Sequence, residues 1–248
     1  MKRRRWLILI AILIVGLGLA CWRPWQTRLH VIHKGGKGPP TLVLLHGYGS
    51  SAQHWIPYTQ TIPLSASGRF LFPVAPEAVT RRDGLMDGRA WWDLDLAAHR
   101  RPTGIGVDLT NEDPRGLERA ARLVRRSLED EGNSVAHPFV LGGFSQGAMV
   151  ACEVAFFSDE PLAALVILSG TPVDRAGWQP RMATRRGVPV FMSHGRADNI
   201  LPFDLAERLH RELVAAGLAV TFVPFDGGHE IAEEVVTALG AFLARIGR

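Results

Sequence analysis

Short apolar runs alternate with segments of helical periodicity along most of this chain. A short strand is predicted over residues 28–33, and the apolar runs that follow are TLVLLHG (41–47), RFLFPVAP (69–76), HPFVLGGF (137–144), ALVILSG (164–170), VPVFMSHG (188–195) and AVTFVPF (219–225). Continuous apolar runs of this length are typical of strands that are buried on both faces of a parallel sheet.

Helices are predicted between these runs. In the clearest one, Leu117, Ala121, Val124 and Leu128 recur at helical spacing, with Asp113 and Pro114 suited to its start and Gly132 to its end. Further helices are predicted over 146–158, 203–217 and 230–246. Strands that alternate with helices predict a mainly parallel α/β sheet with helices on both faces. Reactive groups of such sheets gather at the carboxyl ends of the strands.

The N-terminal segment has a different pattern. Four cations, at positions 2–5, precede an apolar run from Trp6 to Trp22, which would span about 25 Å as a helix. Three interpretations stay open: a retained membrane anchor, a cleaved signal, or a lipid-modified Cys21. Each interpretation places the rest of the chain outside the cytoplasm. In a bacterium, that compartment would be the periplasm. We therefore expect an anchor or signal over 1–25 and one catalytic domain over 26–248.

Composition narrows the class of the folded part. The chain has 248 residues, of which 47% are hydrophobic and 21% charged, as in a single globular α/β domain. The net charge is +4, but the arginines are scattered or lie along one predicted helix, which favours a solvated surface over nucleic-acid binding. Cys21 and Cys152 suffice for neither a disulfide framework nor a metal site, and Cys152 is expected in the core.

One serine stands in a distinctive turn. Gly143-Phe144-Ser145-Gln146-Gly147 lies where a predicted strand ends and an apolar helix begins. This context fits the nucleophile elbow G-x-S-x-G, in which a sharp turn exposes the serine hydroxyl. Side chains at Gly143 or Gly147 would crowd the close approach of strand and helix. We therefore predict that Ser145 is a nucleophile.

A serine nucleophile needs a histidine base held by a carboxylate. In hydrolases with this elbow the chain order is serine, acid, histidine, and only His194, His210 and His229 follow Ser145. His210 falls inside a predicted helix with an exposed position, and His194 ends a strand ahead of most of the available carboxylates. His229 follows the last strand in a Gly-Gly-His loop, so it is the predicted base.

The acid must lie between Ser145 and His229. Asp198 directly follows a predicted strand and is the preferred candidate. Asp174 is weaker, Asp204 is expected to cap a helix, and Asp226 is expected to brace the histidine loop.

The oxyanion of the intermediate requires hydrogen-bond donors. One is the backbone amide of Gln146 at the start of the helix. The segment LLHGYGSS (44–51) supplies the other, with the amide of Tyr48 flanked by Gly47 and Gly49.

Together these motifs resemble those of the phospholipase/carboxylesterase family, which includes acyl-protein thioesterases. The resemblance rests on LLHGYGSSAQHW, GRAWWDL, LGGFSQGAMVA, HGRADNILP and GGHEI. It implies an α/β-hydrolase fold, a triad of Ser145, Asp198 and His229, oxyanion donors at Tyr48 and Gln146, and no cofactor or metal. It also implies that Trp91 and Trp92 lie near the acyl or leaving-group pocket, although core packing explains them equally well.

The expected activity is that of a serine carboxylesterase acting on small-molecule or lipid esters, with thioesters and lysophospholipids also open. Two alternatives remain: an acyltransferase using the same triad, and a catalytically silent binding module tethered to a membrane. The export or anchor segment argues against cytosolic lipidated proteins as substrates. The segments 97–113 and 171–187 match no motif, and loops of this kind set substrate choice.

Overall fold

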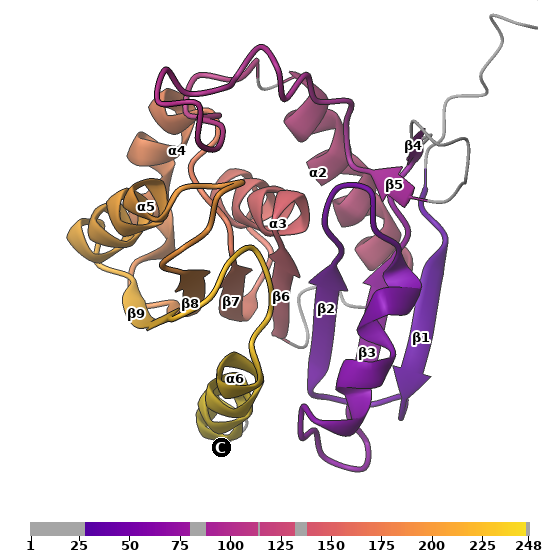
Figure 1. Cartoon of the computed structure of the whole chain (residues 1–248). Coiled ribbons are helices and arrows are strands. Elements are labelled where there is room, and N and C mark those ends of the chain that lie inside the picture. Colours follow the sequence, from indigo (N-terminus) through magenta and orange to yellow (C-terminus); the bar gives the residue numbers. More distant parts are fainter. Residues whose placement is uncertain (1–27, 80–87, 114, 132–137, 247–248) are drawn as a thin grey trace, which may run out of the picture.

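The computed structural model describes residues 28–79, 88–113, 115–131 and 138–246 (Figure 1). The predicted anchor or signal, with Cys21, lies outside the described residues. Among the residues that are described, no helix has both the length and the apolar character needed to cross a membrane.

A seven-stranded sheet forms the centre of the molecule, in the order β1-β3-β2-β6-β7-β8-β9. Strand β1 is antiparallel to β3, and every other neighbouring pair in this sheet is parallel. The prediction of a mainly parallel sheet is therefore confirmed. Its strands are β1 (Val31–Gly35), β2 (Thr41–Leu45), β3 (Arg69–Pro73), β6 (Phe139–Phe144), β7 (Leu162–Leu168), β8 (Pro189–Gly195) and β9 (Ala219–Phe225).

Helices cover both faces of this sheet, as predicted (Figure 1). One face carries α2 (Arg115–Asp130), α3 (Gln146–Phe157), α4 (Arg175–Met182) and α5 (Phe203–Ala215); the other carries α6 (Glu233–Ile246) and the short 3₁₀ helices η1 (Ala52–Trp55) and η2 (Pro57–Gln60). Two apolar cores result, one on each face. Strand β2 is buried along its whole length because both cores enclose it, which explains its continuous apolar sequence.

Three features differ from the sequence prediction. The unassigned segment 171–187 contains α4 and a 3₁₀ turn, η3 (Ala183–Arg185). Asp174 caps α4 by accepting a hydrogen bond from the Gly177 amide at 3.2 Å, and Trp178 is fully buried. A small hairpin, β4 (Glu77–Val79) and β5 (Gly88–Ala90), was not predicted. The last helix begins at Glu233, three residues later than predicted, and the first strand begins at Val31.

Strands β2 and β6 are neighbours in the sheet although about a hundred residues separate them in sequence. From β2 the chain continues to β3 on one side, and from β6 to β7 on the other side. Their carboxyl ends therefore form a topological switch point, where open α/β sheets bind their ligands. Ser145 directly follows β6, and residues 46–50 follow β2.

Candidate active site

The turn from β6 into α3 holds Ser145 in an unusual backbone conformation. Its φ is 54° and its ψ is −121°, a region that L-residues rarely adopt. The flanking glycines make the turn possible: a Cβ at Gly143 would lie 2.4 Å from the Gly147 carbonyl carbon, and a Cβ at Gly147 would lie 2.2 Å from the Leu45 oxygen. The packing thus has no room for a side chain at either glycine, as the motif predicts.

Three side chains from different loops meet at this turn. His229 Nε2 lies 2.8 Å from Ser145 Oγ, and His229 Nδ1 lies 2.7 Å from Asp198 Oδ2. Because a carboxylate only accepts, Nδ1 carries the proton and Nε2 accepts the hydrogen bond from the serine hydroxyl. The loops after β6, β8 and β9 thus bring the predicted nucleophile, acid and base into one hydrogen-bonded chain.

Asp198 is held by four groups. Its Oδ1 accepts from the backbone amides of Ile200 at 2.9 Å and Leu201 at 2.8 Å. Burial alone would raise the pKa of this carboxyl, but hydrogen bonds from His194 and His229 outweigh it and hold the pKa well below its usual range. Asp198 therefore stays ionised and can orient an imidazole at neutral pH.

His194 has a supporting position that the sequence did not reveal. Its Nε2 lies 2.7 Å from the Leu201 carbonyl oxygen and 3.2 Å from Asp198 Oδ2. Both partners are acceptors, so this nitrogen carries a proton and donates. The ring is fully buried, and it contacts the same carboxylate oxygen as His229. The only sequence signal was its place four residues before Asp198.

The other candidates for base and acid do not join this chain. His210 is half-buried on α5, with its ring centroid 4.8 Å from that of Phe222. The prediction that Asp204 caps a helix is wrong: Pro202 is the N-cap of α5, and Asp204 lies in the first turn and accepts from Arg101. Asp174 caps α4 instead.

Asp226 does not brace the histidine loop in the way that was predicted. Its side chain is 96% exposed and lies 3.5 Å from the Arg196 guanidinium. An ion pair this exposed contributes little to stability.

The loop after β2 lies against the elbow. A Cβ at Gly47 would lie 3.4 Å from the Ser145 Cβ, and Gly49 adopts a φ of 68°. Among the residues that the structure describes, neither the Tyr48 amide nor the Gln146 amide donates a hydrogen bond to another residue. Unpaired amides beside a serine are what an oxyanion hole requires, and the role of this pair stays a prediction.

Side chains also connect these two segments, which sequence reasoning missed. The Gln146 side chain accepts from the Trp91 amide at 2.9 Å and donates to the Trp92 carbonyl at 2.9 Å. The Trp91 indole then donates to the His46 carbonyl at 2.7 Å. All four residues lie in motifs of the sequence, but Gln146 was singled out there only for its backbone amide, and Trp91 and Trp92 only as possible pocket residues. The contacts of its side chain depend on tertiary structure.

His46 is a neutral part of this arrangement. Burial lowers the pKa of its imidazole to about 4. Its Nδ1 lies 2.9 Å from the Gly47 carbonyl and its Nε2 lies 3.2 Å from the Ala75 amide nitrogen, so Nδ1 donates and Nε2 accepts. The ring therefore fixes the start of the loop by hydrogen bonds at both nitrogens.

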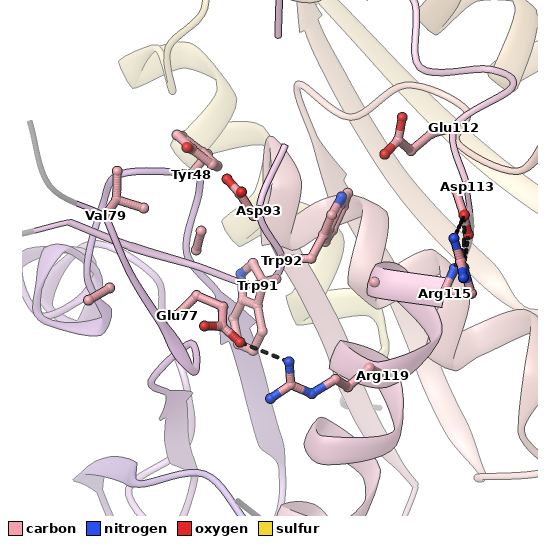
Figure 2. A pocket seen from close by; sticks show the side chains of 13 residues that line it. Tyr48, Glu77, Val79, Trp91, Trp92, Asp93, Glu112, Asp113, Arg115 and Arg119 are labelled. Atoms are coloured by element: carbon pink, nitrogen blue, oxygen red, sulfur yellow. Dashed lines mark hydrogen bonds and ion pairs between the residues drawn. The ribbon is translucent and has the colours of Figure 1, made fainter. Parts of the chain in front are cut away.

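A cavity of about 740 Å³ opens on the Tyr48 side of the loop. Trp91 and Trp92 line it, yet only 2% and 5% of their surfaces are exposed, so both also belong to the core. Most of the other lining side chains are charged. Figure 2 shows Glu77 facing Arg119, at 2.9 Å, and Asp93 beside Tyr48. Burial and the charge of Asp93 raise the pKa of the Tyr48 phenol.

A second cavity, of about 470 Å³, lies on the His229 side. Its walls are mainly apolar and include Phe144, the residue before the serine. The Phe144 and His229 ring centroids are 4.9 Å apart. The loop after β2 thus separates a charged cavity from an apolar one.

This fold, with a serine elbow at the switch point of its sheet, defines an α/β-hydrolase. The chain belongs to the phospholipase/carboxylesterase family, whose model matches residues 26–246. It is therefore a hydrolase of the carboxylesterase/thioesterase family, as the sequence motifs indicated.

Curated relatives and solved structures agree with this membership. Acyl-protein thioesterase 1 of Eremothecium gossypii is 29% identical over 70% of this chain and 72% of its own length. The Mycosarcoma maydis protein of the same name is 28% identical over 86% and 93%. The crystal structure of esterase PE8 is 26% identical, with a TM-score of 0.72 over 88% of this chain and 99% of its own. The Bacillus cereus carboxylesterase, at 21% identity and a TM-score of 0.65 over 88% and 94%, shares the fold.

Proposed function

We propose that this protein is a serine carboxylesterase that works through an acyl-enzyme on Ser145. The observation that supports this most strongly is the chain of hydrogen bonds from Ser145 through His229 to Asp198, at 2.8 and 2.7 Å. A buried, ionised aspartate holds the imidazole in the tautomer that accepts the serine proton. The strained backbone of Ser145 presents its hydroxyl at the switch point of the sheet.

The mechanism follows from these positions. Ser145 Oγ attacks the acyl carbonyl carbon while His229 Nε2 takes the hydroxyl proton, and the amides of Tyr48 and Gln146 stabilise the oxyanion. His229 then donates that proton to the departing alcohol or thiol, which leaves the acyl group on Ser145. Water, deprotonated by His229, releases the acid and restores the serine. Oxygen esters and thioesters both suit this scheme.

We also propose that residues 1–25 carry this domain outside the cytoplasm and hold it at, or release it from, a membrane. The apolar run behind four cations supports this. The mass of the mature chain distinguishes its three forms: an intact N-terminus, cleavage near Ala20, or a lipid on Cys21. An unprocessed chain in the soluble cytoplasmic fraction would contradict the proposal.

The central test replaces the nucleophile. Ser145→Ala in the full chain should lower turnover of a 4-nitrophenyl ester and of a short acyl thioester by about 10⁴- to 10⁶-fold. It should also abolish labelling by a fluorophosphonate. The control is Ser158→Ala at the other end of α3, where the hydroxyl donates to the Val154 carbonyl, and it should keep wild-type turnover.

Equal rates for wild type and Ser145→Ala would contradict the assignment. A folded wild-type chain that neither hydrolyses esters nor reacts with the probe would instead indicate a silent binding module. Product analysis with added glycerol separates hydrolysis from acyl transfer, because a transferase forms mainly acylglycerol under those conditions and a hydrolase forms mainly the free acid.

A further inference from the structure

We propose that the cavity on the His229 side, hereafter the base-side cavity, binds the leaving group of the substrate and selects uncharged, apolar alcohols or thiols. This inference rests on the proposed function of Ser145, since it assigns one part of the ester to one side of that serine. The volume of the base-side cavity, about 470 Å³, is within the range of small-molecule sites.

The direction of proton transfer places the leaving group on this side. In acylation the bond from the carbonyl carbon to Ser145 Oγ forms, and the bond to the leaving oxygen or sulfur breaks. The proton on His229 Nε2 goes to that leaving atom, so the atom must come within hydrogen-bond reach of the imidazole. The base-side cavity has His229 itself in its wall, with Phe144 and Ile231 beside it.

A second part of the lining determines which groups fit. It is formed by Trp55, Pro57 and Tyr58 from η1 and η2. The Trp55 and Tyr58 rings pack edge to face, with centroids 5.4 Å apart. Aromatic and alkyl groups bury their surface favourably between such walls, whereas an unpaired anion would lose its hydration there.

Three polar side chains of the base-side cavity already have partners, whereas the buried Trp55 Nε1 has none among the described residues. Ser50 Oγ lies 2.6 Å from His54 Nδ1, and Glu230 Oε1 accepts from the Gly228 amide at 3.2 Å. No lysine or arginine is among the described residues that line it. A carboxylate or phosphate on the leaving group would therefore meet one existing negative charge, Glu230, and no permanent cation.

The charged cavity on the Tyr48 side differs in each respect. Its lining includes Asp93, Glu112, Asp113, Arg115 and Arg119. A charged leaving group would suit that side better, but a group there would not share a wall with His229. The contrast also provides a control position, because Val79 lines the charged cavity and makes no contribution to the base-side one.

The experiment compares butyrate esters that differ only in the alcohol: benzyl, 4-carboxybenzyl and glycerol. For the wild-type full chain we expect kcat/KM to be at least about tenfold higher for the benzyl ester than for the other two. Tyr58→Ala with Ile231→Ala removes apolar contact from two walls and should cut that preference by about tenfold or more. Val79→Ala should leave it unchanged.

Deacylation distinguishes a leaving-group site from an acyl site. Every butyrate ester gives the same butyryl-Ser145, and the alcohol has left before this intermediate decays. If the base-side cavity binds only the alcohol, the decay rate in stopped flow should be the same in wild type and in the double variant. A changed decay rate, or a changed preference for acyl length with the same alcohol preference, would overturn the inference and place the acyl chain in this cavity.

Two other outcomes are also decisive. A wild-type enzyme that hydrolyses all three esters equally well would overturn the inference without requiring any variant. A chain that hydrolyses no ester and leaves Ser145 unlabelled by fluorophosphonate would overturn the proposed function, and this inference with it. Circular dichroism of the double variant excludes loss of fold as the cause of a changed preference.

Discussion

At the scale of single residues, Trp91 connects the two segments that carry the predicted oxyanion donors. Its amide donates to the side chain of Gln146, next to the nucleophile, and its indole donates to the His46 carbonyl at the start of the loop. The ring is 2% exposed, so no water competes for these bonds and the loop is fixed relative to the elbow. We therefore propose that Trp91 positions the Tyr48 amide, the predicted oxyanion donor.

Trp91→Phe tests this connection because it removes the indole N–H and keeps an aromatic ring. We expect kcat to fall about tenfold or more with KM changed less than about threefold. A displaced donor stabilises the transition state less, and it leaves binding of the substrate ground state unaffected. The loss should not exceed the 10²–10³-fold effect of deleting a donor outright. Steady-state kinetics with one short ester measures both constants.

Trp178→Phe is the matched control, because that indole is also buried and donates to Glu153 at 2.7 Å, away from the triad. It should lower the midpoint of thermal unfolding and leave kcat unchanged. Equal losses of kcat in the two variants would mean that Trp91 acts through stability alone.

At the scale of elements, the site depends on how closely α3 approaches β2. Gly147, in the first turn of α3, lies directly over the end of β2, and Gly143 lies against Gly147 across the turn. Almost every side chain of α3 is buried, because α2 and α4 cover it on the side away from the sheet. The helix therefore has no freedom to move outward and relieve a clash at its start.

Gly147→Ala should destabilise the fold by about 1–3 kcal/mol, because the new methyl group would overlap the Leu45 carbonyl oxygen. Chemical denaturation measures the change in the free energy of unfolding. Gly228→Ala is the control, since a Cβ there meets nothing within 4 Å among the described residues, and its effect should stay within about 0.5 kcal/mol. Similar values for both variants would contradict the tight approach.

The elements show where sequence pattern is sufficient and where it is not. Buried strands such as β2 and β8 were predictable because their apolar runs are continuous, and the order of motifs pointed to Asp198 and His229. Helix α4 was missed because it is eight residues long and contains Pro180. The hydrogen bonds of Trp91 were not predictable, because His46 and Gln146 are far from it in the sequence. Those of His194 were not predictable either, because only the fold of the loop after β8 brings Asp198 and the Leu201 carbonyl to one ring nitrogen.

At the scale of the whole molecule, the carboxyl group of Glu153 lies against the larger of the two cores. Glu153 on α3 is only 3% exposed. Burial is the main reason that its pKa is raised, to about 7. The charges of Asp174 and Glu118 raise the pKa further. The hydrogen bond from Trp178 and the charge of Arg122 lower it. Near neutral pH this carboxyl therefore changes charge against a core that all of α3 shares.

Stability should consequently fall as pH rises. The folded pKa of Glu153, about 7, exceeds the ordinary value of 4.5, so the folded state binds more protons between these two values. The contribution of protonated Glu153 to the free energy of unfolding is complete below about pH 4.5 and is lost as pH rises through 7. The total loss is about 3 kcal/mol at most.

Glu153→Gln removes this titration while keeping an oxygen that can accept from Trp178. Free energies of unfolding from urea titrations at pH 5 and pH 8 provide the comparison, with the exposed Glu207→Gln as control. The Glu153 variant should match wild type within about 1 kcal/mol at pH 5 and exceed it by about 1–3 kcal/mol at pH 8. Wild type and the control should lose stability in parallel over this range. If the Glu153 variant loses as much as they do, the carboxyl is already ionised in the folded core at pH 5, and another group governs the pH dependence of the whole molecule.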